Sequence, residues 1–593
     1  MKSFFSSFLG SCLGFLAGLL LLFIMLGALV QGIALFSDRA PDVKENSVLE
    51  LNLNMNITER ITHNPFSNFD FLSLSSVPSM GLDQILAAIS RATHDSRIKG
   101  IWLHTEQLSA GLASVNAIRS ALVDFKAKGK FIVSYADSYD QKAYYLASVS
   151  DHIFLPPTGM LSWKGLSVNT FYYKKLLDRF AIDLQPIRHG KFKSAVEPFL
   201  VEEMSTENRE QLSVLLQTVW SHMADSVASS RGLNREQLDG WAQEQLFRDE
   251  RKALEMGMID SILYFDQAED VLSSLSGGEE TYNAIALIDY ARLQPPSLPT
   301  IPGQQAVAVV YAFGDLVSGS SAAGQMGSET IRDALRDAVA DVEVKAIVLR
   351  INSPGGSALA AEMVWREVKQ AAASKPLVVS MGDMAASGGY YMALPAKEIW
   401  ADPVTLTGSI GVYGLYPCFE ALLEDKIGIT PQEVATHSGA DAGSFFRKMT
   451  PLETEWAQES VERVYQTFLS HVVEQRPLSA EAADSVAQGR VWSGADALRI
   501  GLIDSLGGLD QAIARAAALA NLDPYFVKGF PKEKSFMEEL LGDVGFALKA
   551  RFSAPSPFDE LPVPSLKRLL RESGVQMRMP EGFELTESLW FKK

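Results

Sequence analysis

The chain has few cysteines and histidines, and none of them forms a metal-binding pattern. Among 593 residues there are two cysteines and eight histidines. Cys12 lies in an apolar N-terminal run and Cys418 lies far from it, so we expect no framework of disulfides. The sequence contains no HExxH and no CxxC, which are short spacings typical of zinc sites. We therefore expect no metal and no cofactor.

Positive charge is also scarce. The chain has 53 Lys and Arg residues against 71 Asp and Glu residues, which gives a net charge of -18 and a pI near 5.0. Nucleic-acid binding depends on a basic surface, so we expect no nucleic-acid partner. The rest of the composition, 47% hydrophobic and 21% charged, is typical of a globular protein with several domains.

Charged residues are missing from one long stretch near the N-terminus. Residues 4–36 carry none, and the core Leu13–Val30 is long enough to cross a bilayer as a helix. A cleavable signal peptide is the competing interpretation, but the run is long for one and no clear small-x-small cleavage site precedes Ser37. We expect an uncleaved anchor within residues 1–45. The flanking charges do not decide its orientation.

Beyond this stretch, strand-like and helix-like segments alternate, which predicts a layered α/β fold. The same order occurs twice. Residues 97–103 (RIKGIWL) match residues 343–349 (EVKAIVL), an offset of 343 − 97 = 246. Roughly a hundred residues align at this offset without a gap, which indicates two copies of one unit. We expect repeats at 46–300 and 301–520, separated near a Pro-rich linker, and a tail at 521–593.

The two copies differ at positions that could carry chemistry. Ser409 lies between two glycines in the second copy and corresponds to Trp163 in the first. Lys193 in the first copy corresponds to Gly439 in the second. The second copy therefore has a presented serine without the lysine, and the first has the lysine without the serine. Two complementary half-sites indicate one shared active site.

These residue types suit acyl transfer. A serine hydroxyl needs a base, and a buried lysine can serve because desolvation lowers its pKa. We expect Ser409 to be the nucleophile and Lys193 the general base. Gly355 and Gly356 follow a strand and could donate backbone N–H groups to an oxyanion. A further serine, Ser438 or alternatively Ser194, could hold the amine in place.

Each of these residues also has an ordinary structural interpretation. Most lysines are simply on the surface, and a Gly-Gly pair is commonly a turn. Ser387, in the segment AASGGYY, is a rival nucleophile of the same presented type, and it corresponds to Gln141 in the first copy. We rank it second because the glycines after it also suit close helix packing.

Together these segments resemble one known family, the long-form signal peptide peptidase A (protease IV) family. The resemblance extends from the N-terminal run to about residue 520 and rests on four motifs: TGSIG at 407–411, NSPGGS at 352–357, AASGGYY at 385–391 and GKFKSAVEP at 190–198. It implies a duplicated crotonase/Clp-protease-like fold with a Ser-Lys dyad, the serine from the second copy and the lysine from the first. It also implies a homotetramer anchored in the bacterial inner membrane, with its catalytic part outside the cytoplasm, that degrades signal peptides after their release.

Two other functions fit the same fold. An acyl-thioester-binding protein of the crotonase type would not need the Ser/Lys pair, and a non-catalytic membrane scaffold would not keep both halves of it. For a peptidase, we expect an extended apolar peptide to pair its backbone with a strand edge near Gly355. The tail has no counterpart in the family that we can match.

Overall fold

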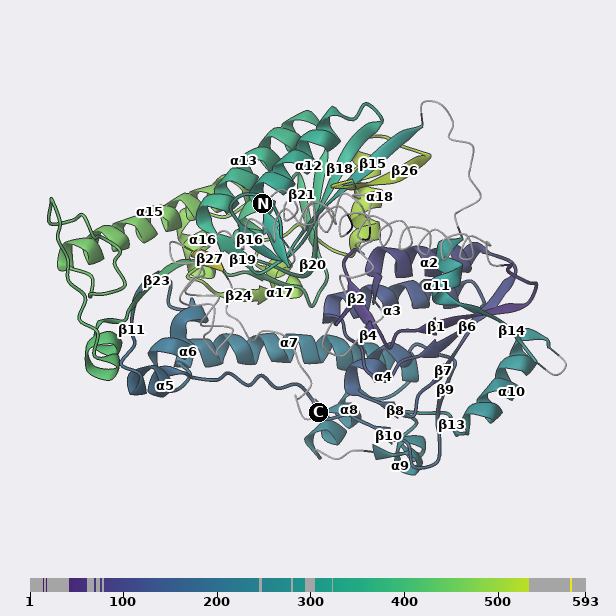
Figure 1. The fold of residues 1–593 in the computed structure, drawn as a ribbon. Helices are drawn as coiled ribbons and strands as arrows, with labels where there is room; N and C mark the ends of the chain where they lie inside the picture. The colour runs from purple at the N-terminus through teal and green to yellow at the C-terminus, as the bar shows by residue number, and fades with distance from the viewer. Residues whose placement is uncertain are drawn as a thin grey trace.

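The computed structural model describes residues 42–60, 69–70, 75–76, 79–244, 248–278, 281–293, 304–322, 324–532 and 576–578, together with Gly14 and Gly18. Within these ranges the chain forms two α/β units that lie side by side (Figure 1). The predicted linker between the repeats falls on residues 294–303, outside the described ranges.

Each repeat is built around six parallel strands. In the first repeat the strands are β1 (Ser47–Asn52), β6 (Ile98–His104), β7 (Phe131–Tyr135), β9 (His152–Leu155), β13 (Ser261–Ile262) and β14 (Asn283–Ala286). In the second they are β15 (Gln305–Phe313), β18 (Val344–Ser353), β20 (Leu377–Ala386), β21 (Glu398–Ala401), β25 (Ser505–Leu506) and β26 (Tyr525–Phe530). The first sheet has the order β13-β9-β7-β6-β1-β14. The second has eight strands, which include the matching order β25-β21-β20-β18-β15-β26. Its other two strands are β22 (Leu406–Gly408), which pairs with the end of β20, and β24 (Val491–Ser493), which pairs with β22.

The helices and the smaller strands repeat at the offset found in the sequence. Helix α2 (Leu82–His94) corresponds to α12 (Ser328–Ala340), and α3 (Leu112–Ala127) to α13 (Ala358–Ser374), because 328 − 82 and 358 − 112 both equal 246. The short strands β8 (Ser138–Tyr139), β10 (Met160–Leu161) and β12 (Arg248–Asp249) correspond to the end of β20, to β22 (Leu406–Gly408) and to β24 (Val491–Ser493). The two repeats therefore share one topology.

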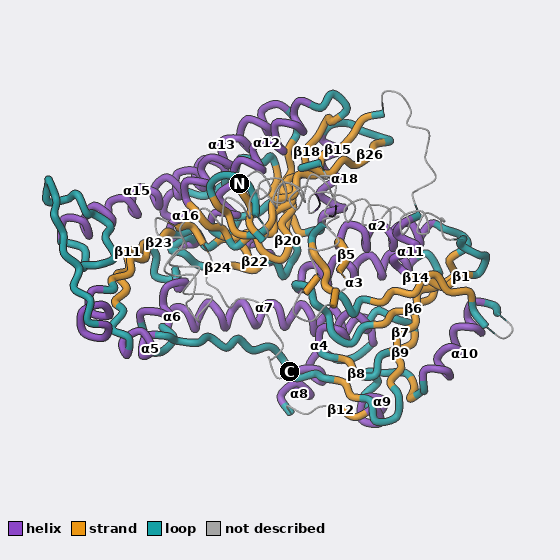
Figure 2. The backbone as a smooth tube through the Cα atoms, in the orientation of Figure 1, coloured by secondary structure: helices purple, strands orange, loops and turns teal. Residues whose placement is uncertain are grey.

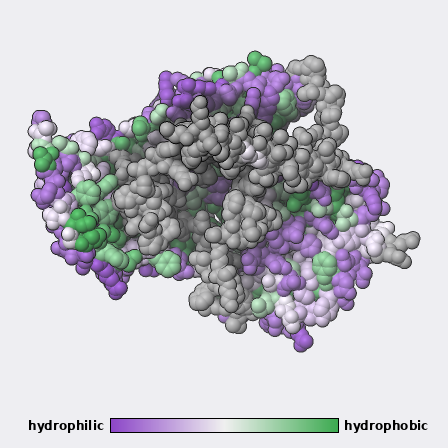
Figure 3. Space-filling model, viewed as in Figure 1, coloured by the Kyte–Doolittle hydropathy of each residue, from purple (hydrophilic) through white to green (hydrophobic). Residues whose placement is uncertain are grey.

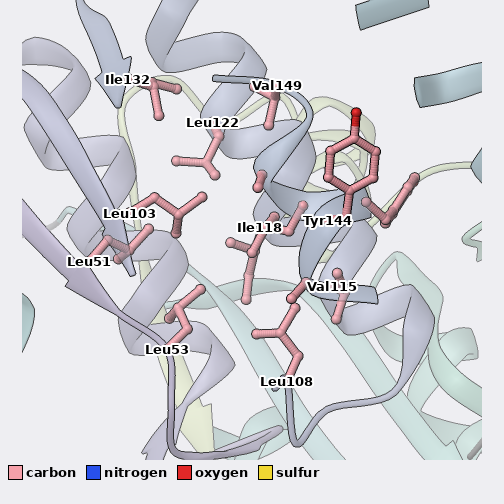
Figure 4. Packing of buried hydrophobic residues seen from close by; sticks show 14 of the residues in the cluster. Leu51, Leu53, Leu103, Leu108, Val115, Ile118, Leu122, Ile132, Tyr144 and Val149 are labelled. Carbon is pink, nitrogen blue, oxygen red and sulfur yellow. The ribbon is translucent and has the colours of Figure 1, made fainter. Parts of the chain in front are cut away.

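The strands form where the sequence has short apolar runs, because parallel strands are covered by helices on both faces. In the first repeat Leu51 of β1 and Leu103 of β6 point toward Ile118 and Leu122 of α3 (Figure 4). All four side chains are fully buried. Truncating such a residue to alanine costs about 2–5 kcal/mol, since it leaves a cavity in a close-packed interior. These cores fix the ends of the strands, and the candidate site lies at those ends.

An arm extends from one side of the molecule (Figure 2). It contains β11 (Asp183–His189) of the first repeat, paired antiparallel with β23 (Val412–Cys418) of the second over the whole length of both strands. Helix α5 (Lys174–Arg179), the π-helical turn Leu422–Ile427 and α15 (Pro451–Gln475) belong to the same region. Helix α7 (Thr206–Arg231) runs from the arm back beneath the molecule to the first repeat (Figure 1).

The remaining elements are shorter. They are β2 (Asn56–Thr58), β3 (Phe69–Asp70), β4 (Ser75–Ser76), β5 (Ser79–Gly81), α4 (Gln141–Ala147), the 3-10 turn Ser194–Val196, α6 (Glu197–Leu200), α8 (Arg235–Gln243), α9 (Glu250–Glu255), α10 (Phe265–Ser276), α11 (Leu287–Arg292), β16 (Asp315–Val317), β17 (Gln325–Gly327), β19 (Gly355–Ser357), α14 (Gly388–Ala393), α16 (Ala480–Val486), α17 (Gly494–Arg499), α18 (Leu509–Leu519) and β27 (Gln576–Arg578).

Polar side chains join the two repeats. The Arg350 guanidinium donates to both carboxylate oxygens of Glu59, at 2.9 and 3.1 Å, and both side chains are almost fully buried. Asp383 accepts from the backbone and the hydroxyl of Ser114, at 3.0 and 2.7 Å. Breaking a buried ion pair leaves an unpaired charge and costs several kcal/mol, so these contacts hold the repeats in one relative position.

The predicted membrane anchor at residues 4–36 lies outside the described residues, apart from Gly14 and Gly18. Among the residues that the structure describes, no helix is both long and apolar enough to span a bilayer.

Candidate active site

Lys193 is the buried residue on which the site is centred. It follows the last residue of β11 by four positions and precedes the 3-10 turn Ser194–Val196. Its side chain is 0% exposed. The amine Nζ lies 2.9 Å from Ser387 Oγ, 3.0 Å from Ser409 Oγ and 3.0 Å from the Ser409 carbonyl oxygen. The lysine of the first repeat thus meets two serines of the second.

Burial lowers the pKa of Lys193 well below its usual value near 10.5, and burial is the only cause of the shift. A charged ammonium has three donors and no acceptor, whereas a neutral amine has two donors and one lone pair. The carbonyl oxygen can only accept, whereas the two serine hydroxyls can also donate, so a neutral amine can donate twice here and accept once from a serine. A neutral lysine can act as a base at physiological pH, so the site meets the first chemical requirement for activating a serine.

Ser409 lies directly after β22 and has a positive φ of 52°. Its amide donates to the Arg490 carbonyl oxygen at 2.7 Å, and its own carbonyl oxygen accepts from Lys193. The Ser409 backbone is therefore fixed by Arg490, and both its carbonyl oxygen and its hydroxyl contact the Lys193 amine. With these two contacts Ser409 can hold the amine in place.

Ser387 occupies a sharp turn between β20 and α14. Its φ of 55° and ψ of -113° are unusual for a residue with a side chain. A serine on a strained strand-to-helix turn is the arrangement in which a nucleophilic hydroxyl is presented at the edge of a sheet. The Ser387 amide donates to the Gly408 carbonyl oxygen at 2.7 Å, which fixes the turn against the strand that carries Ser409.

The glycine pair Gly355 and Gly356 lies on the opposite side of Ser387 from Ser409. Ser353, Ala385 and Thr407 are neighbours in register on three parallel strands, with Ala385 in the middle. Just beyond the ends of these strands come Gly355, Ser387 and Ser409. The strand that leads to Ser387 is therefore the direct neighbour of the strand that leads to Gly355, whereas the strand that leads to Ser409 is one strand further away.

Gly356 has a φ of 155°, and a Cβ atom there would lie 2.1 Å from the Leu316 carbonyl oxygen, so only glycine fits. Gly355 donates its N–H to the Ser353 hydroxyl at 3.1 Å, a bond that an oxyanion would have to displace. The pair therefore places backbone without a Cβ atom on the strand next to that of Ser387, where an oxyanion hole would need its donors.

Comparison with known proteins identifies the family of the chain. The sequence profile of Peptidase family S49 matches residues 124–278 and again 369–523, so the two matches lie 369 − 124 = 245 residues apart. Protease 4 of Salmonella typhi is 36% identical over 481 residues, which is 79% of this chain and 77% of that protein. The chain belongs to Peptidase family S49.

The serine protease SPPA of Arabidopsis thaliana, described as chloroplastic, is another relative of this S49 chain. It is 34% identical over 81% of this chain and 70% of its own length. A ClpP1 mutant of Listeria monocytogenes aligns with 35% of this chain and 94% of its own at 14% identity, and the TM-score of 0.24 is too low to support an argument. This chain is a serine peptidase, as its S49 membership indicates.

One predicted residue does not lie in this S49 site. Ser438 is exposed in the loop after the π-helical turn, and among the described contacts Lys193 has none with it. The second serine beside Nζ comes instead from the Ser387/Ser409 pair. The sequence could not show this, because residue 438 follows the arm strand β23, which leads away from the site.

Ser194, the alternative candidate for holding the lysine amine, has other hydrogen-bond partners. Its hydroxyl donates to Asn208 Oδ1 at 3.0 Å and accepts from Gln211 Nε2 at 3.1 Å. Gln211, on α7, also donates to the Phe192 carbonyl oxygen at 3.2 Å and accepts from the Val491 amide at 3.2 Å. This buried network fixes the backbone on both sides of Lys193. The sequence gives no signal for it beyond the polar residues of an amphipathic helix.

Gly489 is another residue that the sequence analysis missed. It has a φ of 79°, and a Cβ atom there would lie 2.6 Å from Lys193 Cβ. A glycine is therefore required for the lysine stem to pass. Its place in the segment Gln488-Gly489-Arg490, far along the chain from Lys193, carries no marker of this role.

The other basic residues near Lys193 point elsewhere. Lys191 is exposed, and its amine lies over the ring of Phe192. His189 Nδ1 lies 2.6 Å from Glu462 Oε2, and its ring stacks on Tyr465 at 3.6 Å. Of these three residues, Lys193 alone contacts the two serines.

Proposed function

We propose that this serine peptidase is an endopeptidase with a Ser-Lys dyad in which Ser387 is the nucleophile, Lys193 the general base and Ser409 the residue that holds the lysine. The sequence alone favours Ser409 as the nucleophile. Two observations favour Ser387 instead: its strained turn between strand and helix, and its place on the strand next to Gly355. The nucleophile and the oxyanion donors must both lie about 3 Å from the reacting group, which suits neighbouring strands better than strands two apart.

The reaction then follows from the contacts. Ser387 Oγ gives its proton to the neutral amine of Lys193, 2.9 Å away, and attacks the peptide carbonyl carbon. The oxyanion accepts hydrogen bonds from the backbone N–H groups of Gly355 and Gly356. Lys193 returns the proton to the leaving amine as the C–N bond breaks, which leaves an acyl group on Ser387. Water, deprotonated by the same lysine, releases the acid.

The substrates we propose are apolar peptides in extended form, and signal peptides left in the membrane after their cleavage are the most suitable class. The family resemblance and the long uncharged N-terminal run support this. On this proposal residues 4–36 anchor the chain in the bacterial inner membrane, and residues from Asp38 onward lie outside the cytoplasm. Protease added to intact spheroplasts should digest a C-terminal tag; complete protection of the tag would contradict this topology.

We also propose a homotetramer. Residues 166–172 and 412–418 are related by the repeat offset, as are 183–189 and 429–435, because 412 − 166 and 429 − 183 both equal 246. Within one chain 183–189 pairs with 412–418, whereas 166–172 and 429–435 belong to no strand. Pairing between 429–435 of one copy and 166–172 of the next would repeat the same contact around a ring.

The exposed apolar side chains of the arm support this assembly. Ile429 is 54% exposed, Phe446 55% and Phe171 67%. Apolar residues are visible on the arm at the left of Figure 3. Sedimentation velocity on the chain should give four copies, and Ile429→Asp should dissociate them. A monomer at micromolar concentration would contradict the assembly without affecting the proposed chemistry.

The experiment that tests the chemistry is hydrolysis of an apolar peptide by single variants. Ser387→Ala should abolish acyl-enzyme formation, while Ser409→Ala should leave a slow reaction in which the lysine is less well held. Circular dichroism would show that each variant is folded. Full activity in Ser387→Ala would contradict the assignment and return the nucleophile to Ser409.

A further inference from the structure

A short segment of the C-terminal tail is part of the sheet beside the active site. Strand β27 pairs antiparallel with β19, with Gly355 opposite Arg578, Gly356 opposite Met577 and Ser357 opposite Gln576. On its other side Gln576 pairs with Tyr413 of β23. The resulting sheet has the order β11-β23-β27-β19-β16-β17, so β27 fills the space between two strands that do not pair with one another.

The positions of the two strands that flank β27 show that β27 lies next to the turn of Ser387. Strand β19 begins two residues after β18 ends, and β23 begins four residues after β22 ends. In the main sheet β20 lies between β18 and β22, and β20 ends at the residue before Ser387. A strand held between β19 and β23 therefore occupies the position beyond the end of β20, where the nucleophile is presented.

The direction of β27 also fits a substrate. From its first residue, Gln576, to its last, Arg578, β27 passes along β19 from Ser357 to Gly355. Because β27 is also antiparallel to β23, moving along β27 in this direction leads from Tyr413 back toward the turn that carries Ser409. The carboxyl end of β27 is therefore the end nearest the glycine pair and the lysine. A peptide substrate needs the same direction. Its residues before the scissile bond would pair with the two flanking strands, and its scissile carbonyl group would then reach the nucleophile.

We infer that residues 576–578 occupy the substrate-binding groove of this peptidase, so that the chain's own tail competes with the peptide to be cleaved. The inference rests on the proposed function, because it assigns the occupant of the same groove. The recognition is through backbone pairing with the facing edges of β19 and β23, a mode that accepts extended peptides of varied sequence. The sheet is thus continuous from β23 to β19 only when a peptide strand, either the chain's own tail or a substrate, lies between them.

Competition of this kind has a measurable consequence. When only a fraction of the molecules has an open groove, the apparent dissociation constant of an external peptide rises by the inverse of that fraction. A tail that occupies the groove nine-tenths of the time weakens binding about tenfold. Removing the tail strand should therefore strengthen peptide binding without any change in the catalytic residues.

The test uses full-length chain and two truncated chains, all carrying Lys193→Met so that no peptide is consumed. One truncated chain ends at Val575 and lacks β27; the matched control ends at Met579 and keeps it. The probe is a fluorescent apolar decapeptide without proline, and the readout is its dissociation constant from fluorescence anisotropy. The chain ending at Val575 should bind the probe at least about threefold more tightly than the other two, which should resemble one another.

A pair of point variants in the full-length chain separates backbone pairing from side-chain contacts. Met577→Pro removes the backbone N–H and restricts φ, so it should displace the tail and strengthen probe binding. Met577→Ala keeps the backbone donor and should leave the dissociation constant nearly unchanged. Equal binding by all three chains of the truncation series would overturn the inference alone. Absence of probe binding in every chain would contradict the proposed groove, and the inference with it.

Discussion

Lys193 Nζ lies 2.9 Å from Ser387 Oγ, although the two residues belong to different repeats and are 194 positions apart. On the proposed mechanism neither repeat can act without the other, since the lysine is in one and the serines and glycines are in the other. The ion pair of Glu59 with Arg350 and the contact of Ser114 with Asp383 keep this alignment. Duplication followed by specialisation of each copy explains why one fold occurs twice and one site once.

Lys193 should be indispensable, and its neighbour Lys191 should not. Lys193→Met removes the only amine that contacts Ser387 and Ser409 among the described residues, and the loss in kcat/KM should be on the order of 10³-fold or more. Lys191→Met changes an exposed side chain and should leave kcat/KM within about twofold. Steady-state hydrolysis of an apolar peptide would measure both. A severe loss with Lys191→Met alone would mean that the base is misassigned.

Activity should rise with pH through a lowered lysine pKa. Burial lowers the pKa of Lys193, so the neutral, basic form predominates above that value and is lost as the pH falls through it. The kcat/KM profile should therefore show a single ascending limb below the ~10.4 of a free lysine. His189→Ala should keep this limb, because His189 contacts Glu462 and Tyr465 instead of the serines. Its disappearance in folded His189→Ala would indicate an imidazole base.

Gly489→Ala should impair catalysis more than an equally strained glycine substitution elsewhere. The new Cβ atom would lie 2.6 Å from Lys193 Cβ and push the lysine stem away. A displacement of ~1 Å can cost about 10²-fold in rate. Gly428 has the same φ of 79° with no atom within 4 Å of its Cβ position, so Gly428→Ala controls for backbone strain. Equal kcat/KM in the two variants would contradict the role given to Gly489.

The buried ion pair between the repeats should contribute strongly to stability. Glu59→Gln leaves the Arg350 guanidinium buried without its carboxylate partner, which should lower the unfolding free energy by about 3–5 kcal/mol. Asp333→Asn, in an exposed pair with Arg332, should leave the urea midpoint unchanged. Urea unfolding followed by tryptophan fluorescence would compare the two. A Glu59→Gln midpoint equal to that of the original chain would show that other contacts align the repeats.

Asp402 should make stability depend on pH. Burial raises its pKa to about 6, and its carboxylate accepts from Asn116 of the first repeat at 2.6 Å. A raised carboxyl pKa means that the folded state binds more protons, so the unfolding free energy should fall as the pH rises from about 4 to about 6. Asp402→Asn should reduce this slope, as measured by thermal unfolding across that range. An unchanged slope would show that other groups cause the pH dependence.

The sequence predicts most of the site because the duplication supplies an internal comparison. A fixed offset isolates Lys193 and Ser409 as positions where the copies differ, and both contact one another in the structure. The rank of the two serines does not follow from the sequence. It depends on which strand lies in the middle of the sheet, and parallel strand order is set by crossover connections that a linear pattern does not encode.

Ser438 and the tail illustrate the same limit. Ser438 is a candidate for holding the lysine amine in the sequence analysis, but β23 pairs with β11 and carries the chain into the arm, away from the site. Residues 576–578 have no strong strand pattern of their own. They form a strand because their backbone pairs with β19 on one side and with β23 on the other, and only the assembled sheet brings these two strands to either side of them.

The most direct test of the central claim is covalent labelling of the active serine. The chain should be treated with a fluorophosphonate, digested and examined by mass spectrometry, with Lys193→Met as the control that lacks the base. We predict a single modified serine, Ser387, and no modification in the control. A label on Ser409 with Ser387 unmodified would contradict the account.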